Sequence, residues 1–151
     1  MIYYTDRQYM EDSIKEEIKR ADHLIYVSLK YTRTCDVIKN VIQRLLNVFN
    51  FGIAEILEKE KKRNKIKIVP ASPLARASLL EKLLKSKVKK HMNLYMLLRK
   101  IDKSEFIRRE EYRKNVALVI KEGSIVVDMV TLKNFFEKTK EFVKFVEEFK
   151  V

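Results

Sequence analysis

The 151-residue sequence contains only two glycines, two prolines and one cysteine. Gly52 and Gly123 are too few to form either of the glycine-rich loops that cradle phosphates in many nucleotide-binding proteins. The scarcity of glycine and proline also argues against long loops, collagen-like repeats and disordered linkers. Because Cys35 stands alone, an internal disulfide and a cysteine-based zinc site are both excluded.

Long apolar runs are also missing. No uncharged apolar stretch approaches the roughly 18 residues that a membrane-spanning helix needs. The first residues turn acidic before any apolar run of signal-peptide length. We therefore expect a cytoplasmic protein that does not contact a membrane. Lys outnumbers Arg 23 to 10, a bias typical of thermophile proteins and equally of AT-rich genomes.

The positive charge is concentrated in the middle of the chain. The formal net charge is +12, with 33 basic and 21 acidic side chains. Residues 59–121 carry a net +14, whereas residues 1–58 and 122–151 each carry −1. A block of one sign raises the local potential and attracts polyanions.

Apolar spacings of three and four residues predict five helices. Thr5 and Gln8 fit a capping box at the start of the first helix, and Thr34 is the expected N-cap of the second. Ser72 followed by Pro73 is a strong start signal for the third. The helices are expected over residues 6–30, 35–63, 73–86, 88–103 and 132–149, the last of them capped by Thr131. In the first helix, Leu24, Val27 and Tyr31 are expected to widen the buried stripe near its end.

Two β-branched runs around Glu122-Gly123 predict a β-hairpin over 115–121 and 124–130. The polar segment 104–114 before it is interpreted as a helical turn or a loop.

These elements indicate a mainly α fold, a helical bundle with one β-hairpin before the C-terminal helix. A single domain, 1–151, is expected to comprise a helical hairpin (1–63), a basic helical region (64–114) and the β-hairpin with the last helix (115–151). The first two helices should pair antiparallel. The second helix is apolar over so wide a face that it must contact several neighbours or a second subunit, which favours a homodimer. Gly52 inside it is explained by close helix–helix approach.

The stretches 21–28 and 53–57 resemble the first two helices of the HEPN superfamily of helical domains, which are often homodimers. The whole chain also resembles a family of archaeal proteins without an established activity, through residues 30–34, 97–100, 113–116 and 137–142. Catalytic HEPN ribonucleases carry an Arg four to six residues before a His. Neither His23 nor His91 has such an Arg, so the resemblance implies at most a non-catalytic scaffold.

Small polar clusters give weaker candidates for a site. His23 and His91 lack the spacing of a metal-binding motif, and each is expected to be a partly exposed helix residue without a metal. Cys35 lies at a helix start, where the helix dipole could activate it as a nucleophile, although a semi-buried structural role is favoured. Around the first helix–helix corner, a polar pocket for an anion, or else a hydrogen-bonded clasp, is expected from Tyr26, Tyr31, Arg33 and Asp36.

The basic block gives the strongest functional signal. Lysine and arginine side chains bind phosphates with release of counterions, so we expect the block to bind nucleic acid, RNA in preference to DNA. Tyr95, Phe106 and Tyr112 lie within it and could stack on bases, although Tyr95 also fits the apolar stripe of its helix. The expected contacts are Lys61, Lys62, Arg63, Lys65, Lys67, Lys87, Lys89, Lys90, Arg99, Lys100, Lys103, Arg108, Arg109, Arg113 and Lys114.

Two alternatives stay open. An assembly module would use the apolar face of the second helix or the C-terminal helix as a partner surface. An enzyme or a nucleotide-binding protein would need a pocket built from the polar cluster. The sequence contains no cofactor-binding motif, and the interpretation as a protein without enzymatic activity is favoured.

Overall fold

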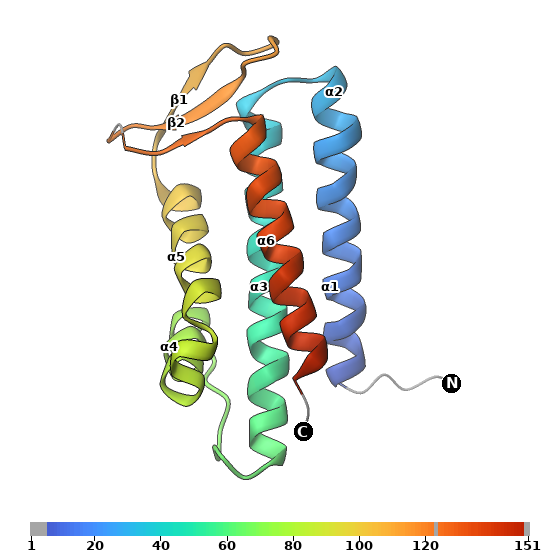
Figure 1. Cartoon of the computed structure of the whole chain (residues 1–151), viewed down its shortest axis with the longest axis vertical. Helices are drawn as coiled ribbons and strands as arrows, with labels where there is room; N and C mark the ends of the chain where they lie inside the picture. Colours follow the sequence, from blue (N-terminus) through green and yellow to red (C-terminus); the bar gives the residue numbers. More distant parts are fainter. Residues whose placement is uncertain (1–5, 123, 150–151) are drawn as a thin grey trace.

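Three long helices run side by side along the molecule. A computed structural model describes residues 6–122 and 124–149 of the chain. The long helices are α1 (Asp6–His23), α3 (Cys35–Lys62) and α6 (Met129–Glu148) (Figure 1). α4 (Pro73–Leu84) and α5 (Lys89–Lys103) form a second layer on one side of α3. The expected helical bundle with a β-hairpin before its last helix is confirmed, as is the antiparallel pairing of α1 and α3.

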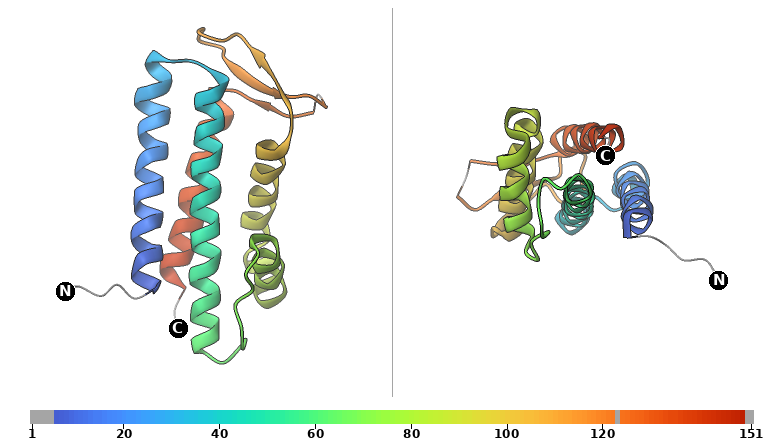
Figure 2. Two further views of the ribbon diagram at one scale, coloured as in Figure 1. Left: turned by 180° about the vertical axis from the view of Figure 1, so that it is seen from behind. Right: turned by 90° about the horizontal axis from the view of Figure 1, so that it is seen from below.

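The centre of the bundle is α3. Seen from below, it lies between α1, α6 and the α4–α5 layer (Figure 2), and it contacts all four of these helices. Its fully buried side chains, among them Ile38, Leu45 and Phe49, point toward several neighbours at once. The wide apolar face is therefore covered within one chain and does not require a second subunit. The homodimer stays a prediction.

Gly52 lies where α3 packs against Phe142 and Val146 of α6. A Cβ atom added at Gly52 would lie 2.6 Å from Cε2 of Phe142 and 3.1 Å from Cγ2 of Val146. The expected close helix–helix approach at this glycine is confirmed, and the neighbour is the C-terminal helix.

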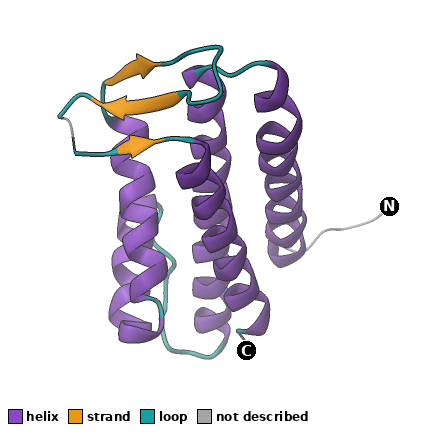
Figure 3. Cartoon of the chain, turned by 45° about the horizontal axis from the view of Figure 1, so that its top comes forward, coloured by secondary structure: helices purple, strands orange, loops and turns teal. Residues whose placement is uncertain are grey.

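A three-stranded antiparallel sheet lies across one end of the bundle (Figure 3). Its strands are β1 (Phe106–Arg109), β2 (Ala117–Ile120) and β3 (Val126–Val127). The interpretation of 104–114 as a helical turn or loop is wrong, because β1 pairs with β2 from Phe106 opposite Ile120 to Arg109 opposite Ala117. A four-residue strand that ends in two arginines has too little alternation of apolar and polar residues to be recognised from its own sequence. It is a strand because it pairs with a distant segment.

The helix starts follow local capping chemistry. Thr34 Oγ1 accepts a hydrogen bond from the N–H of Val37, and Ser72 Oγ accepts one from the N–H of Ala75, as expected. α6, however, begins at Met129, and its cap is Asp128 rather than Thr131. The Asp128 carboxylate accepts a hydrogen bond from the N–H of Thr131 at 2.8 Å, which also holds the pKa of Asp128 below its usual range. The expected cap Thr5 lies outside the described residues.

The first helix changes its winding near its end. Leu24–Ser28 form a π-helical turn, followed by α2 (Leu29–Tyr31). Ile25 and Leu29 continue the buried stripe, but Val27 and Tyr31 are exposed, contrary to expectation. No helix in the described part of the chain combines the length and apolarity needed to cross a lipid bilayer.

Candidate nucleic-acid interface

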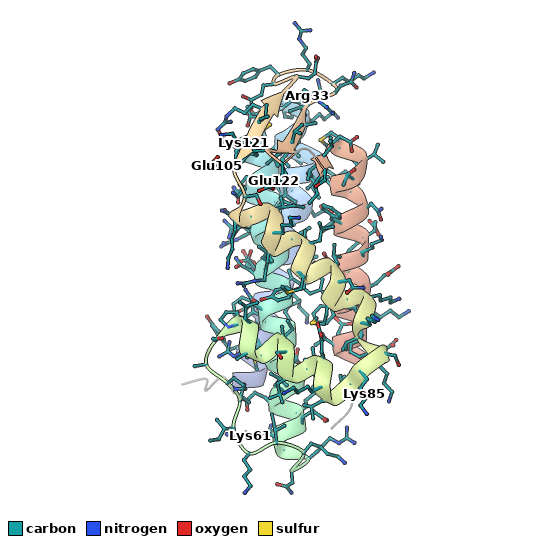
Figure 4. The ribbon with its side chains drawn as sticks, turned by 90° about the vertical axis from the view of Figure 1, so that its left-hand side faces the viewer. Arg33, Lys61, Lys85, Glu105, Lys121 and Glu122 are labelled. Atoms are coloured by element: carbon teal, nitrogen blue, oxygen red, sulfur yellow. The ribbon has the colours of Figure 1, made fainter. Side chains whose placement is uncertain are left out.

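Most of the expected phosphate-binding residues belong to the end of α3, the α4–α5 turn, α5 and β1, whereas Lys114 lies in a cleft with Tyr26 and Lys133. Figure 4 shows the α4–α5 side of the bundle, with Lys61 at one end, Lys85 on the α4–α5 turn and Lys121 near the sheet. We call the surface formed by the fifteen residues predicted above the basic layer. It runs from the end of α3 through the α4–α5 turn and the second half of α5 to β1 and the turn after it. All of its members are exposed, except Arg99, which is half-buried.

Only part of this charge is neutralised within the chain. Four members form ion pairs of 2.9–4.0 Å: Arg63 with Glu60, Lys90 with Glu141, Arg108 with Asp36 and Glu111, and Arg113 with Glu110. Within residues 6–122 and 124–149, the other members have no carboxylate within ion-pairing distance: Lys61, Lys62, Lys65, Lys67, Lys87, Lys89, Arg99, Lys100, Lys103, Arg109 and Lys114. Unpaired surface cations of this kind can bind phosphates without first breaking an internal ion pair.

Lys59 begins the basic segment in the sequence but does not belong to this surface. Its side chain is only 2% exposed and lies 3.7 Å from the carboxylate of Glu55. It also donates hydrogen bonds to the carbonyl oxygens of Val146 and Phe149 at the end of α6. Lys59 is therefore part of the core.

The aromatic residues of the basic segment divide into core and surface. Tyr95 is fully buried, and its hydroxyl donates to Asn50 at 2.7 Å, so it cannot stack on a base. Phe106 is half-buried, with Lys39 and Arg108 over its ring. Tyr112 is 75% exposed on the turn after β1, and Tyr31, from the first helical hairpin, is 81% exposed at the same end of the bundle.

The polar cluster at the first corner separates into two groups. Tyr26 and Arg33 line one cleft. Asp36 lies elsewhere and accepts a hydrogen bond from Arg108 at 2.9 Å, which lowers the pKa of its carboxyl. Tyr31 does not line the cleft. The expected four-residue pocket is therefore not formed as a unit. The cleft is lined instead by Lys30 from the same corner and by Lys114 and Lys133 from distant segments.

Cys35 is a core residue. Its Sγ donates to the carbonyl oxygen of Ala117 at 3.2 Å, and its backbone N–H donates to the Glu111 carboxylate at 2.8 Å. Burial raises the pKa of its thiol, which is the opposite of what an activated nucleophile requires.

The two histidines lie in different environments. His23 is exposed, as expected. His91 is only 6% exposed, so its expected partial exposure is wrong. The reason is that the rings of Phe142 and Phe145 on α6 cover it at 5.3 and 5.4 Å. Among the described residues, no three His, Cys, Asp or Glu side chains come together in a group that could hold a metal ion.

Comparisons with protein-family models, with curated proteins and with solved structures found no match. The resemblances to HEPN domains and to an archaeal family therefore stay predictions.

Proposed function

We propose that this chain binds single-stranded RNA through the basic layer. The observation that carries the proposal is the set of exposed lysines and arginines in the basic layer for which the described part of the chain provides no carboxylate partner; Figure 4 shows the α4–α5 side of the bundle, with Lys61 at one end. Each lysine or arginine that replaces a counterion on a phosphate adds to the affinity. This contribution decreases steeply as the salt concentration rises. The contacts are to phosphates, which position a strand without reading its sequence.

The length of the basic layer determines how long an RNA strand it can bind. α3 has 28 residues, so it is about 42 Å long at about 1.5 Å per residue, and the layer extends along it from end to end. A strand with bases about 3.4 Å apart needs about 12 nucleotides to cover this distance.

The aromatic side chains favour a single strand over a duplex. Tyr31 and Tyr112 present their rings to solvent at the sheet end of the layer. Unpaired bases stack on such rings with little sequence preference, whereas the bases of a duplex are already stacked on each other.

Charge removal at matched positions tests the proposal. In the first variant, Lys62, Lys89 and Lys100 are replaced by Gln; in the control, the exposed lysines Lys15, Lys19 and Lys144 on α1 and α6 are replaced by Gln. Both variants lose the same charge. Fluorescence anisotropy with a 12-nucleotide RNA should show more than tenfold weaker binding for the first variant and a salt slope shallower by about 2. Equal weakening of both variants would show that only net charge matters and would contradict the proposed interface.

A further inference from the structure

A second cationic feature lies at the corner between the first helical hairpin and α6. It is a cleft of about 400 Å³, which we call the Tyr26 cleft, lined by Tyr26, Lys30, Arg33, Lys114 and Lys133 over an apolar floor of Ile25, Leu29 and Met129. Its size lies within the usual range for small-molecule sites. Lys30, Arg33 and Lys133 come from segments of net negative charge, so the cleft is largely independent of the basic block in the sequence.

Within the part of the chain that the structure describes, no carboxylate lines this cleft. Four acidic residues near this end of the bundle are engaged elsewhere: Asp36 with Arg108, Glu111 with Arg108 and the N–H of Cys35, Glu110 with Arg113, and Asp128 with the N–H of Thr131. Among the described residues, none of the four cations of the cleft forms an ion pair with a carboxylate. Four like charges around one cavity repel one another unless an anion lies between them.

The backbone around the cleft is held in uncommon conformations. Tyr26 lies in the middle of the π-helical turn, a geometry that is frequent at functional sites. Tyr112 has a φ of 66°, which is unfavourable for a bulky side chain, and its N–H donates to the carbonyl oxygen of Arg33 at 2.7 Å. This hydrogen bond ties the turn that carries Lys114 to the segment that carries Arg33. Such strain persists only where the surrounding structure fixes it, so the two backbone segments are held together before a ligand binds.

The cleft also offers a surface for an aromatic ring. The ring of Tyr26 is 46% exposed, packs edge-on against Phe136 at 6.3 Å and has Nζ of Lys133 at 5.5 Å from its centroid. The floor of the cleft is apolar. An anion site with an aromatic wall and an apolar floor fits a phosphate that is attached to a base.

We infer that the Tyr26 cleft binds the terminal phosphate of a 5′-phosphorylated nucleotide, with the adjacent base against Tyr26. A terminal phosphate monoester carries up to two negative charges, whereas an internal phosphodiester carries one, so four convergent cations favour the end of a strand. The nucleotide can be free or can be the first residue of an RNA; the second form rests on the proposed function, and the first does not.

The test compares two RNAs that differ only at the 5′ end. Twelve-nucleotide RNAs labelled at the 3′ end, with a 5′-phosphate or a 5′-hydroxyl, are titrated at about 150 mM salt. One net charge-assisted hydrogen bond corresponds to about tenfold in affinity or more, so we expect the phosphorylated RNA to bind at least tenfold tighter. Calorimetry with adenosine 5′-monophosphate, adenosine and inorganic phosphate identifies the free-nucleotide form.

Matched variants locate the effect. Lys30→Gln combined with Lys133→Gln should abolish the preference for the phosphorylated end. The control, Lys15→Gln combined with Lys144→Gln, removes the same charge from the far part of α1 and α6 and should keep the preference. Circular dichroism checks that both variants are folded.

Each outcome has a distinct meaning. A 5′-phosphate preference that depends on Lys30 and Lys133 supports the strand-end form. Binding of the monophosphate but not of adenosine, lost in the same variant, supports the free-nucleotide form even if no RNA binds. Equal affinity for both RNAs together with no binding of the monophosphate overturns the inference, as does a preference that survives the cleft variant. Failure of the hydroxyl-ended RNA to bind counts against the proposed function alone.

Discussion

The Nζ atom of Lys59 on α3 donates a hydrogen bond to the backbone carbonyl oxygen of Phe149, 2.8 Å away, at the end of α6. A second bond reaches the carbonyl oxygen of Val146 at 3.1 Å. The last carbonyl groups of a helix generally lack helical partners; here the Val146 oxygen also accepts a hydrogen bond from the N–H of Phe149 at 3.2 Å. The buried Lys59 side chain therefore caps the end of the C-terminal helix. The carboxylate of Glu55 lies 3.7 Å from Nζ of Lys59.

Replacing Lys59 by Met should destabilise the fold strongly. The substitution leaves the Glu55 carboxylate buried without this partner and removes a donor from two carbonyl groups. Breaking a buried ion pair in this way typically costs about 3–5 kcal/mol in the free energy of unfolding. Urea denaturation measures the loss. Lys61→Met, at an exposed position one half-turn away, is the control and should change stability by less than about 0.5 kcal/mol. A Lys59→Met variant as stable as its control would contradict this role.

Gly52→Ala should also destabilise the protein, although alanine is the better helix former. The gain in helix propensity is about 1 kcal/mol. Against it, the new Cβ would lie 2.6 Å from Cε2 of Phe142, whose ring is stacked on Phe49 at 4.6 Å and cannot easily move. Overpacking of a core costs about 1–3 kcal/mol, so we expect a net loss of about 1 kcal/mol in thermal or urea unfolding.

A double-mutant cycle separates this contact from other causes. Phe142→Leu opens space opposite Gly52 and destabilises the protein by itself. In the Gly52→Ala background its cost should be smaller, because the clash is relieved. Additive effects would mean that Phe142 does not oppose the new methyl group.

The stability should depend on pH through His91. Burial, and then the neighbouring charge of Lys90, lower the pKa of His91 below its ordinary value of 6.5, and Glu141 opposes this only in part. The unfolded chain therefore binds a proton more readily than the fold does. The contribution of His91 to stability is fully present above about pH 6.5 and is lost progressively as the pH falls toward the lower folded-state pKa.

Unfolding curves between about pH 7 and pH 5 measure this effect. His91→Gln removes the titrating group and should flatten the decline in stability over that interval, whatever its cost at pH 7. A decline of the same steepness in the variant would assign the pH dependence to other groups.

Cys35 should be inert in the folded protein. Its side chain is fully buried, its Sγ donates to the carbonyl of Ala117, and burial raises the pKa of the thiol. We expect a thiol reagent such as iodoacetamide to modify the native protein at least a hundredfold more slowly than the urea-unfolded chain. Rapid labelling under native conditions would mean that the corner around Cys35 opens readily.

Local signals in the sequence predict what depends on a few neighbouring residues. Thr34 and Ser72 start their helices because each hydroxyl binds an N–H three residues later, and Tyr95 is buried because it continues an apolar stripe. Asp128 caps the last helix in place of Thr131 because its carboxylate accepts a hydrogen bond from the N–H of Thr131, so the helix begins nearly one turn earlier than expected.

Features that depend on packing between distant segments were not predictable in this way. β1 exists through its pairing with β2, and His91 is buried by phenylalanines some 50 residues later in the chain. The basic layer could be predicted because most of its residues lie in one charged block of the sequence. The Tyr26 cleft could not be predicted, because Lys30, Lys114 and Lys133 come together only in the fold.

The salt dependence of RNA binding tests the central proposal most directly. The unmodified protein is titrated with a 12-nucleotide hydroxyl-ended RNA at several salt concentrations between about 50 and 200 mM. Single strands contribute a slope of about −0.7 per phosphate contact, so six contacts on the basic layer predict a slope near −4 and about 300-fold weaker binding at the higher salt. No binding at about 50 mM salt, or an affinity that does not change with salt, would contradict the account.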